Sequence, residues 1–279
     1  MNILDSVIWA IQPEYAARMI RMLENGPVAQ ATQSRPQSGK EQPTVGVVPI
    51  RGLISRRESL WTKLFGGATI ESLSAQLQEL ADNPSVKTIV LDIDSPGGSV
   101  AGIPELGGEI LRLRSRKPVI AVANDLMASA AYWLVAQASE IVATPSSLVG
   151  SIGIFALHID QSRALDMAGI KPTFIQFGEN KTLGNPLEPL SERAREEAQK
   201  IVDEHGRMFV RAVADGRRTT LANVQDDFGQ GLAFMPKEAL RLGMIDRIGT
   251  MDEVLQGLGI ESRRSALRKD ITRAALTNR

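Results

Sequence analysis

The sequence contains no cysteine and only two histidines among its 279 residues. Without thiols, thiol catalysis, disulfide bonds and thiolate metal sites are excluded. His158 and His205 cannot build a histidine-rich zinc site, and they are the only possible bases for a Ser-His-Asp triad. The remaining candidate nucleophiles are serine, threonine, lysine and the carboxylates. We expect neither a metal nor any other cofactor.

Net charge is also lacking, because 32 Lys and Arg residues balance 32 Asp and Glu residues. A neutral chain has no overall attraction for nucleic acid, and we expect none as a partner. The apolar stretch at the N-terminus is interrupted by Asp5, Pro13 and Glu14, so it fits neither a signal peptide nor a membrane span. We therefore expect a soluble, cytoplasmic protein without a membrane span.

The first 43 residues differ in composition from the rest of the chain. In residues 1–25, Val7, Ile8 and Ile11 would share one face of a helix, which predicts an N-terminal helical arm. Residues 26–43 are rich in Gln, Ser, Pro and Gly without an apolar period, and this is typical of a flexible linker. We expect the arm to be dispensable for chemistry and to dock on a partner or a neighbouring subunit.

Residues 44–258 alternate between Val/Ile-rich runs and amphipathic stretches, and residues 259–279 form a basic tail. The strands predicted are Val45–Ile50, Thr88–Ile93, Pro118–Ala123, Glu140–Ala143, Ile152–Leu157 and Thr173–Phe177. The helices predicted are Thr69–Asp82, Gly102–Ser115, Ala128–Ala138, Gln161–Ala168, Ser191–Val213, Leu221–Phe228, Pro236–Leu242 and Met251–Leu258. This order indicates an α/β domain with a mainly parallel sheet flanked by helices. Active sites in such sheets lie at the carboxyl ends of the strands.

The sequence Asp-Ser-Pro-Gly-Gly at positions 94–98 follows one of these apolar strands. Consecutive glycines let backbone N–H groups approach a ligand closely, so Gly97 and Gly98 could form an oxyanion hole. A simple turn is the alternative reading of this motif.

Ser129 follows another apolar strand and is flanked by Ala128 and Ala130 at the start of a predicted helix. There its hydroxyl would be accessible, and the N–H of Ala130 could be a second oxyanion donor. Taken alone, a serine among alanines is more typical of close helix packing than of a nucleophile.

Two further segments contribute candidate site residues. The Gly-Ser-Ile-Gly sequence at positions 150–153 suggests that Ser151 and Gly153 line a substrate. Lys181 lies in a loop rich in Gly, Asn and Pro, where a lysine is usually solvated.

Together, these motifs resemble the signal-peptide-peptidase family of Ser/Lys serine peptidases, and within it the phage capsid-assembly proteases of the protein C type. The resemblance extends from about residue 45 to residue 249. It implies a ClpP/crotonase-like fold, with Ser129 as nucleophile and Lys181 as general base. Gly97, Gly98 and Ala130 would then form the oxyanion hole. A lysine accepts a proton only in its neutral form, so substrate or an adjacent subunit would have to bury Lys181.

His158 is the alternative base, because ClpP-like relatives use a Ser-His-Asp triad and place their histidine at a comparable interval. Asp160 is only two residues away, however, which is too close to orient the ring of His158 unless the chain turns there. His205 has the spacing of a packing residue in a helix.

The resemblance implies an endopeptidase that cleaves capsid scaffold and itself, in the cytoplasm of a bacterial host cell or inside a phage prohead. It also implies a homo-oligomer with active sites at subunit interfaces. The alternatives are a housekeeping signal-peptide-peptidase-like protease, a crotonase-type acyl-CoA enzyme and an inactive structural protein. No catalytic carboxylate or adenine site can be identified for the acyl-CoA enzyme, and intact Ser129 and Lys181 argue against the inactive protein.

Overall fold

A computed structural model of the chain describes residues 8–11, 15, 44–58 and 66–260. Within these residues the main sheet has seven strands, in the order β11-β9-β7-β5-β2, with β8 beside β7 and β12 beside β8. Every pairing in it is parallel except that of β11 with β9. The strands are β2 (Val45–Arg51), β5 (Thr88–Ser95), β7 (Val119–Ala128), β8 (Glu140–Ala143), β9 (Leu148–Gly150), β11 (Ala233–Phe234) and β12 (Arg247–Ile248).

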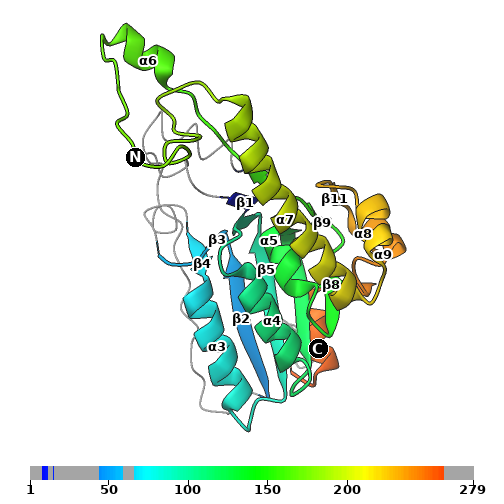
Figure 1. Cartoon of the computed structure of the whole chain (residues 1–279). Helices are drawn as coiled ribbons and strands as arrows, with labels where there is room; N and C mark the ends of the chain where they lie inside the picture. Colours follow the sequence, from blue (N-terminus) through cyan, green and yellow to red (C-terminus); the bar gives the residue numbers. More distant parts are fainter. Residues whose placement is uncertain (1–7, 12–14, 16–43, 59–65, 261–279) are drawn as a thin grey trace, which may run out of the picture.

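A second sheet lies beyond the carboxyl ends of β2 and β5 (Figure 1). In the described part of the chain it has five short strands, in the order β10-β1-β6-β3-β4. They are β1 (Ile8–Ile11), β3 (Leu53–Ser55), β4 (Gly67–Thr69), β6 (Gly97–Ser99) and β10 (Phe155–Ala156). The sheet therefore joins segments that are far apart in the sequence.

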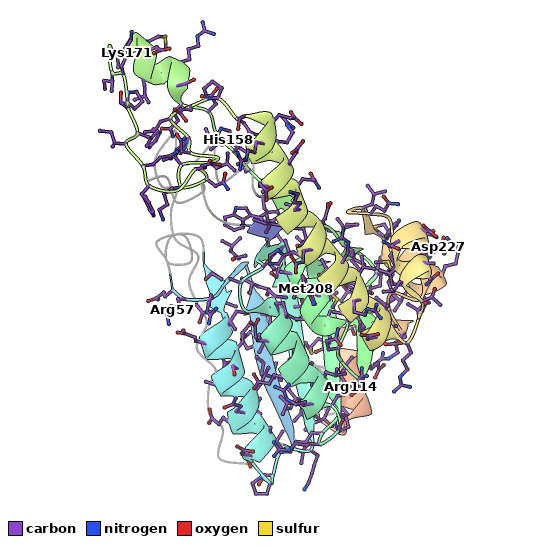
Figure 2. All side chains as sticks on the ribbon, viewed as in Figure 1. Arg57, Arg114, His158, Lys171, Met208 and Asp227 are labelled. Carbon is purple, nitrogen blue, oxygen red and sulfur yellow. The ribbon has the colours of Figure 1, made fainter. Side chains whose placement is uncertain are left out.

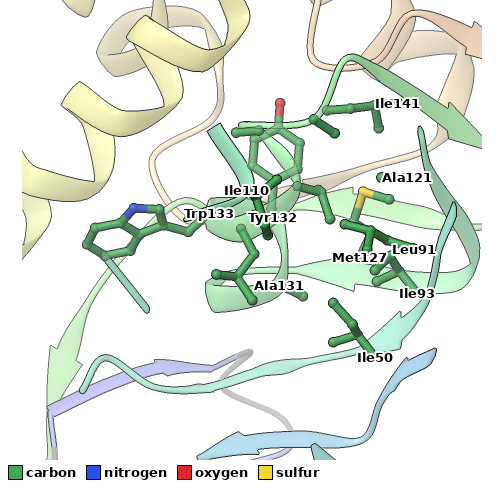
Figure 3. Packing of buried hydrophobic residues seen from close by; sticks show 14 of the residues in the cluster. Ile50, Leu91, Ile93, Ile110, Ala121, Met127, Ala131, Tyr132, Trp133 and Ile141 are labelled. Carbon is green, nitrogen blue, oxygen red and sulfur yellow. The ribbon is translucent and has the colours of Figure 1, made fainter. Parts of the chain in front are cut away.

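Helices cover both faces of the main sheet. The larger apolar core includes residues of six helices, α3, α4, α5, α7, α8 and α9, together with β2, β5 and β7. Figure 3 shows the part of this core around Tyr132 and Trp133. The opposite face is covered by α10, whose Val254 packs with Val90 and Val142. The helices are α3 (Ile70–Asp82), α4 (Ile103–Leu113), α5 (Ala130–Val135), α6 (Ser162–Met167), α7 (Glu192–Arg217), α8 (Leu221–Asp227), α9 (Pro236–Leu242) and α10 (Met251–Gly257).

The segment from 157 to 191 projects from the main body, with α6 at its far end (Figure 1). The long helix α7 leads from this projecting segment back across α4 and α5. Its Phe209 stacks on Trp133 of α5, with ring centroids 4.5 Å apart. This packing fixes α7, and the polypeptide before it, to the body of the domain.

The predicted fold class, an α/β domain with a mainly parallel sheet flanked by helices, is confirmed. The helical arm is corrected in part, because Ile8–Ile11 form a strand and not a helix. Residues 173–177 form no strand, and the predicted strand Ile152–Leu157 is reduced to Phe155–Ala156. The linker at 26–43 and the tail from 261 lie outside the described residues. No helix in the described ranges is long and apolar enough to span a bilayer.

Candidate active site

Ser129 lies between the end of β7 and the first residue of α5. Its φ of 56° and ψ of −119° are unusual for a residue with a side chain. A strained serine at a strand-to-helix turn is the arrangement that hydrolases use to expose a nucleophilic oxygen. Two backbone hydrogen bonds hold this turn: the Ser129 N–H donates to Gly150 O at 2.7 Å, and the Trp133 N–H donates to Ser129 O at 2.9 Å.

The hydroxyl of Ser129 is buried and has no hydrogen-bond partner among the described residues. The whole residue is only 1% exposed. A buried hydroxyl normally has a partner, because an unsatisfied one costs about 1–3 kcal/mol. Both the backbone and the side chain of Ser129 are therefore held in an unfavourable state by the surrounding structure, as is typical of reactive residues.

Gly97 lies directly opposite Ser129. Its φ of 99° is suited to glycine. If residue 97 carried a Cβ atom, that atom would lie 2.9 Å from the amide nitrogen of Ala130 and 3.0 Å from Cβ of Ser129. The structure thus brings Gly97, Ala130 and Ser129 together, whereas their roles stay a prediction. Because α5 is only six residues long, any oxyanion stabilisation here would come from individual N–H groups and not from a helix dipole.

Gly98 also supports the second sheet. A Cβ atom built on Gly98 would lie 1.8 Å from Ile54 O, because β6 pairs with β3 at this position. Glycine is therefore required at position 98 by the close approach of β3 as well as by any role in an oxyanion hole.

The Gly-Ser-Ile-Gly segment borders the site from the far side of β7. Gly150 pairs with Ala128 and accepts the hydrogen bond from Ser129. Ser151 is buried, has a φ of 55° and donates its N–H to Leu232 O at 2.7 Å. Gly153 comes close to Gly231, which is 3.4 Å from a Cβ built on Gly153. This segment therefore positions Ser129, whereas contact of Ser151 and Gly153 with substrate stays a prediction.

Lys181 lies between α6 and α7, within the projecting segment 157–191. Its side chain is exposed, and its ammonium group makes no hydrogen bond or ion pair within the described residues. The single chain therefore does not bring Lys181 into contact with Ser129.

His158 lies near the base of the projecting segment, and Lys171 lies near its tip (Figure 2). The Nε2 atom of His158 is buried and has no hydrogen-bond partner within the ranges that the structure describes. The carboxylate of Asp160 accepts from the Ser162 N–H at 2.9 Å, and hydrogen bonds from Ser162 lower its pKa. No His158–Asp160 hydrogen bond is present in the described part of the chain, so the structure does not form the couple that a triad needs.

Sequence reasoning missed two contributors to the site. Asp92 is buried within β5 and accepts hydrogen bonds from Arg51, at 2.5 Å, and from Asn124. It thereby links β2, β5 and β7 close to the motif at 94–98. In the sequence, the only indication of this role is that Asp92 is a single carboxylate within an apolar run. The second contributor is Ala10, whose carbonyl oxygen lies 2.2 Å from a Cβ built on Gly97. Nothing in the sequence indicates that these two residues meet.

The described residues contain no group of three or more His, Asp or Glu side chains that could hold a metal ion. The groups that converge near Ser129 are a hydroxyl and backbone amides. Such groups can attack a carbonyl carbon and stabilise the oxyanion that forms.

Comparison with known proteins gives a family match and several relatives. The model of peptidase family S49 matches residues 112–263. The capsid assembly protease C of Escherichia phage lambda is 32% identical over 80% of this chain and 51% of its own length. The head-tail preconnector protein GP5 of Enterobacteria phage P21 is 35% identical over 61% of this chain and 34% of its own length.

Cellular proteins match as well. A putative signal peptide peptidase SppA of Enterococcus faecium is 25% identical over 69% of this chain and 56% of its own length. The chain thus spans about a third to just over half of the length of these relatives. Among solved structures, a ClpP1 mutant of Listeria monocytogenes matches 78% of this chain and 93% of its own, with 17% identity and a TM-score of 0.45.

Proposed function

Because this chain belongs to peptidase family S49, we propose that it is a serine endopeptidase with Ser129 as its nucleophile and Lys181 as its general base. The observation that supports this most directly is the state of Ser129: its buried hydroxyl has no hydrogen-bond partner in the described part of the chain, and its backbone has a positive φ. An unsatisfied and strained serine contributes nothing to stability, so its presence is best explained by reactivity.

In the proposed reaction, the Ser129 oxygen attacks the carbonyl carbon of a peptide bond while its proton passes to the neutral amine of Lys181. The oxyanion accepts hydrogen bonds from backbone N–H groups at Gly97, Gly98 and Ala130. Collapse of this intermediate expels the new amine, which takes the proton from Lys181. Water, deprotonated by the same lysine, then releases the acyl group from Ser129 and restores the hydroxyl.

Lys181 can act in this way only if a second surface covers it. In the single chain its side chain is exposed, whereas burial is what favours the neutral form of a lysine. Ile175 and Phe177 in the same segment are 99% and 100% exposed, and apolar residues so exposed indicate an interaction surface. We propose that a second copy of the chain covers this surface, so that Lys181 of one subunit completes the site at Ser129 of another.

The two phage relatives, a capsid assembly protease and a head-tail preconnector protein, support a role in phage head assembly. On this proposal the substrates are capsid scaffold and the protease itself. The match to a putative signal peptide peptidase keeps a cellular housekeeping role as the alternative. Co-expression with the phage's own capsid and scaffold proteins distinguishes the two, because only a head protease would process them.

The proposed chemistry can be tested by labelling the assembled protein with a biotinylated fluorophosphonate and mapping the adduct by mass spectrometry. We expect a single adduct on Ser129, absent from Ser129→Ala and retained in Ser151→Ala. An adduct on another serine, or none under conditions in which the protein cleaves a peptide, would refute Ser129 as nucleophile.

A further inference from the structure

The strand β1 occupies a position next to the proposed catalytic serine. It lies between β6 and β10 and pairs antiparallel with both, Trp9 facing Ser99 on one side and Phe155 on the other. β6 and β10 do not pair with each other in the described residues. If β1 were removed, the second sheet would therefore have an empty position one strand wide, which we call the central strand position.

β1 also reaches the reactive atoms. Its Ala10 faces Gly98, and its Ile11 faces Gly97. A Cβ atom built on Gly97 would be close to three groups at once: Ala10 O at 2.2 Å, the Ala130 amide nitrogen at 2.9 Å and Ser129 Cβ at 3.0 Å. The carbonyl group of Ala10 thus lies beside the hydroxyl-bearing carbon and an N–H group that would hold the carbonyl of a substrate.

The side chains of β1 are buried in this position. Trp9 is 7% exposed, Ala10 0% and Ile11 2%, and Ala10 belongs to the main apolar core. The central strand position therefore accepts an extended apolar segment, with a small residue where the carbonyl meets Ser129. Strand addition of this kind binds peptides through their backbone and selects them through alternate side chains.

We propose that β1 is an internal occupant of the substrate site, so that an extended segment of a protein substrate can bind between β6 and β10 only after β1 has left. The proposal rests on the proposed function, because it assumes that Ser129 attacks a carbonyl presented at this position. It implies that the peptidase is held inactive by its own N-terminal residues until a binding event or assembly withdraws them.

A reversible cross-link can test this proposal in the full chain, because the protein has no cysteine of its own. The substitutions Trp9→Cys and Ser99→Cys place two thiols on directly opposed residues of an antiparallel pair, where Cα separations suit a disulfide. We expect oxidation to slow fluorophosphonate labelling of Ser129 by a factor of about 10 or more, and reductant to restore it. Each single-cysteine variant should give the same labelling rate in oxidant and in reductant.

The proposal is overturned if the cross-linked protein, verified by mass, is labelled as fast as the reduced protein. It is also overturned if the two thiols fail to cross-link in a protein whose circular dichroism is that of the wild type, since β1 would then not occupy the position.

A second variant acts in the opposite direction. Ala10→Arg puts a long charged side chain where there is no exposed surface, so it should expel β1 and speed labelling of Ser129 by about 10-fold. Val47→Arg is the matched control, because Val47 lies on the strand β2 and is 47% exposed. If Ala10→Arg has the thermal stability and the labelling rate of the Val47→Arg protein, β1 does not block the site.

Peptide binding separates this proposal from the proposed function. A fluorescein-labelled peptide with the sequence of residues 6–13 should bind the double variant Ser129→Ala, Ala10→Arg, and bind at least about 10-fold more weakly to Ser129→Ala alone. This binding needs no catalysis. If no serine is labelled in any variant, the proposed function fails, whereas equal binding of the peptide to both variants refutes the occupancy of the site by β1.

Discussion

At the scale of single residues, Ser129 is a position where stability and reactivity conflict. Replacing it by alanine removes the unsatisfied hydroxyl, and replacing it by glycine also relieves the positive φ. We expect both variants to lose peptide cleavage and to gain about 1 kcal/mol in the free energy of unfolding, glycine slightly more than alanine. Urea unfolding and a peptide cleavage assay can measure both effects. A loss of stability in Ser129→Ala would mean that the hydroxyl has a structural role.

Two candidate bases can be ranked by substitution. Lys181→Ala should abolish cleavage, because no neutral amine is left to accept the serine proton, whereas His158→Ala should stay substantially active. Loss of at least 10²-fold in kcat/KM is expected for the lysine variant only. The opposite ranking would assign the base to His158 and require a carboxylate other than Asp160 to orient its ring.

The two glycines of β6 should respond differently to an added methyl group. In Gly98→Ala the methyl would meet the Ile54 backbone at 1.8 Å, which cannot be relieved by moving a side chain. We expect this variant to lose about 3 kcal/mol of stability, as is usual for a severe steric conflict in a buried region. In Gly97→Ala the closest contact is with β1, which can move, but the φ of 99° also strains an alanine, so we expect a smaller loss of stability than in Gly98→Ala, with about 10²–10³-fold lower kcat. Thermal melts together with kinetics would reveal the difference, and equal melting temperatures would contradict it.

At the scale of helices and strands, the C-terminal end of α7 is held by a clamp made of Arg217 and Asp246. The Arg217 guanidinium donates to both carboxylate oxygens of Asp246, at 2.8 and 3.0 Å, and to Gly243 O at 3.0 and 3.1 Å. Burial alone would raise the pKa of Asp246, but the hydrogen bonds from Arg217 and the Ile141 N–H outweigh burial and lower it below 3.8.

Arg217→Ala should therefore lower the free energy of unfolding by about 2 kcal/mol at neutral pH. Because the pKa of Asp246 is lower in the folded protein, the stability due to its charged form is present above pH 3.8 and is lost as the pH falls through the folded value. The difference between Arg217→Ala and wild type should thus shrink in acid. Urea unfolding at neutral and acid pH can measure this, with the exposed Arg207→Ala on the same helix as control. A difference independent of pH would mean that Arg217 acts only through Gly243.

The sequence predicts best the strands whose character does not depend on a distant pairing partner. β2, β5, β7 and β8 are parallel strands with apolar residues on both sides, so composition alone identified them. β1 was predicted as a helix because Ile8 and Ile11 also have helical spacing, and its partners are about 90 and 145 residues away in the chain. Residues 173–177 have the composition of a strand, but among the described residues they pair with no strand and leave Phe177 fully exposed. For the site, motifs predicted that Gly97 and Ser129 lie together, whereas the proposed pairing of Lys181 with Ser129 would require a second copy of the chain.

At the scale of the whole molecule, the proposed assembly shares each active site between two chains. A head-to-tail ring repeats one interface, so every Ser129 would face a Lys181 of the next subunit. Ser129→Ala and Lys181→Ala, each inactive alone, should therefore regain activity when co-expressed, with about a quarter of the interfaces carrying both residues at equal mixing. Activity and native mass of the mixed oligomer are the measurements. A mixed oligomer of confirmed composition without activity would place the dyad within one chain.

The length of α7 has a mechanical consequence. Its 26 residues span about 39 Å, from the projecting segment to the clamp at Arg217. Because Phe209 is held against Trp133, the part of α7 that can act as a lever is the 17 residues before it, about 26 Å long, and a tilt of about 5° there moves its far end by about 2 Å. In the proposed assembly, a small change in the angle of α7 would therefore be enlarged into a displacement of Lys181 relative to the Ser129 that it serves.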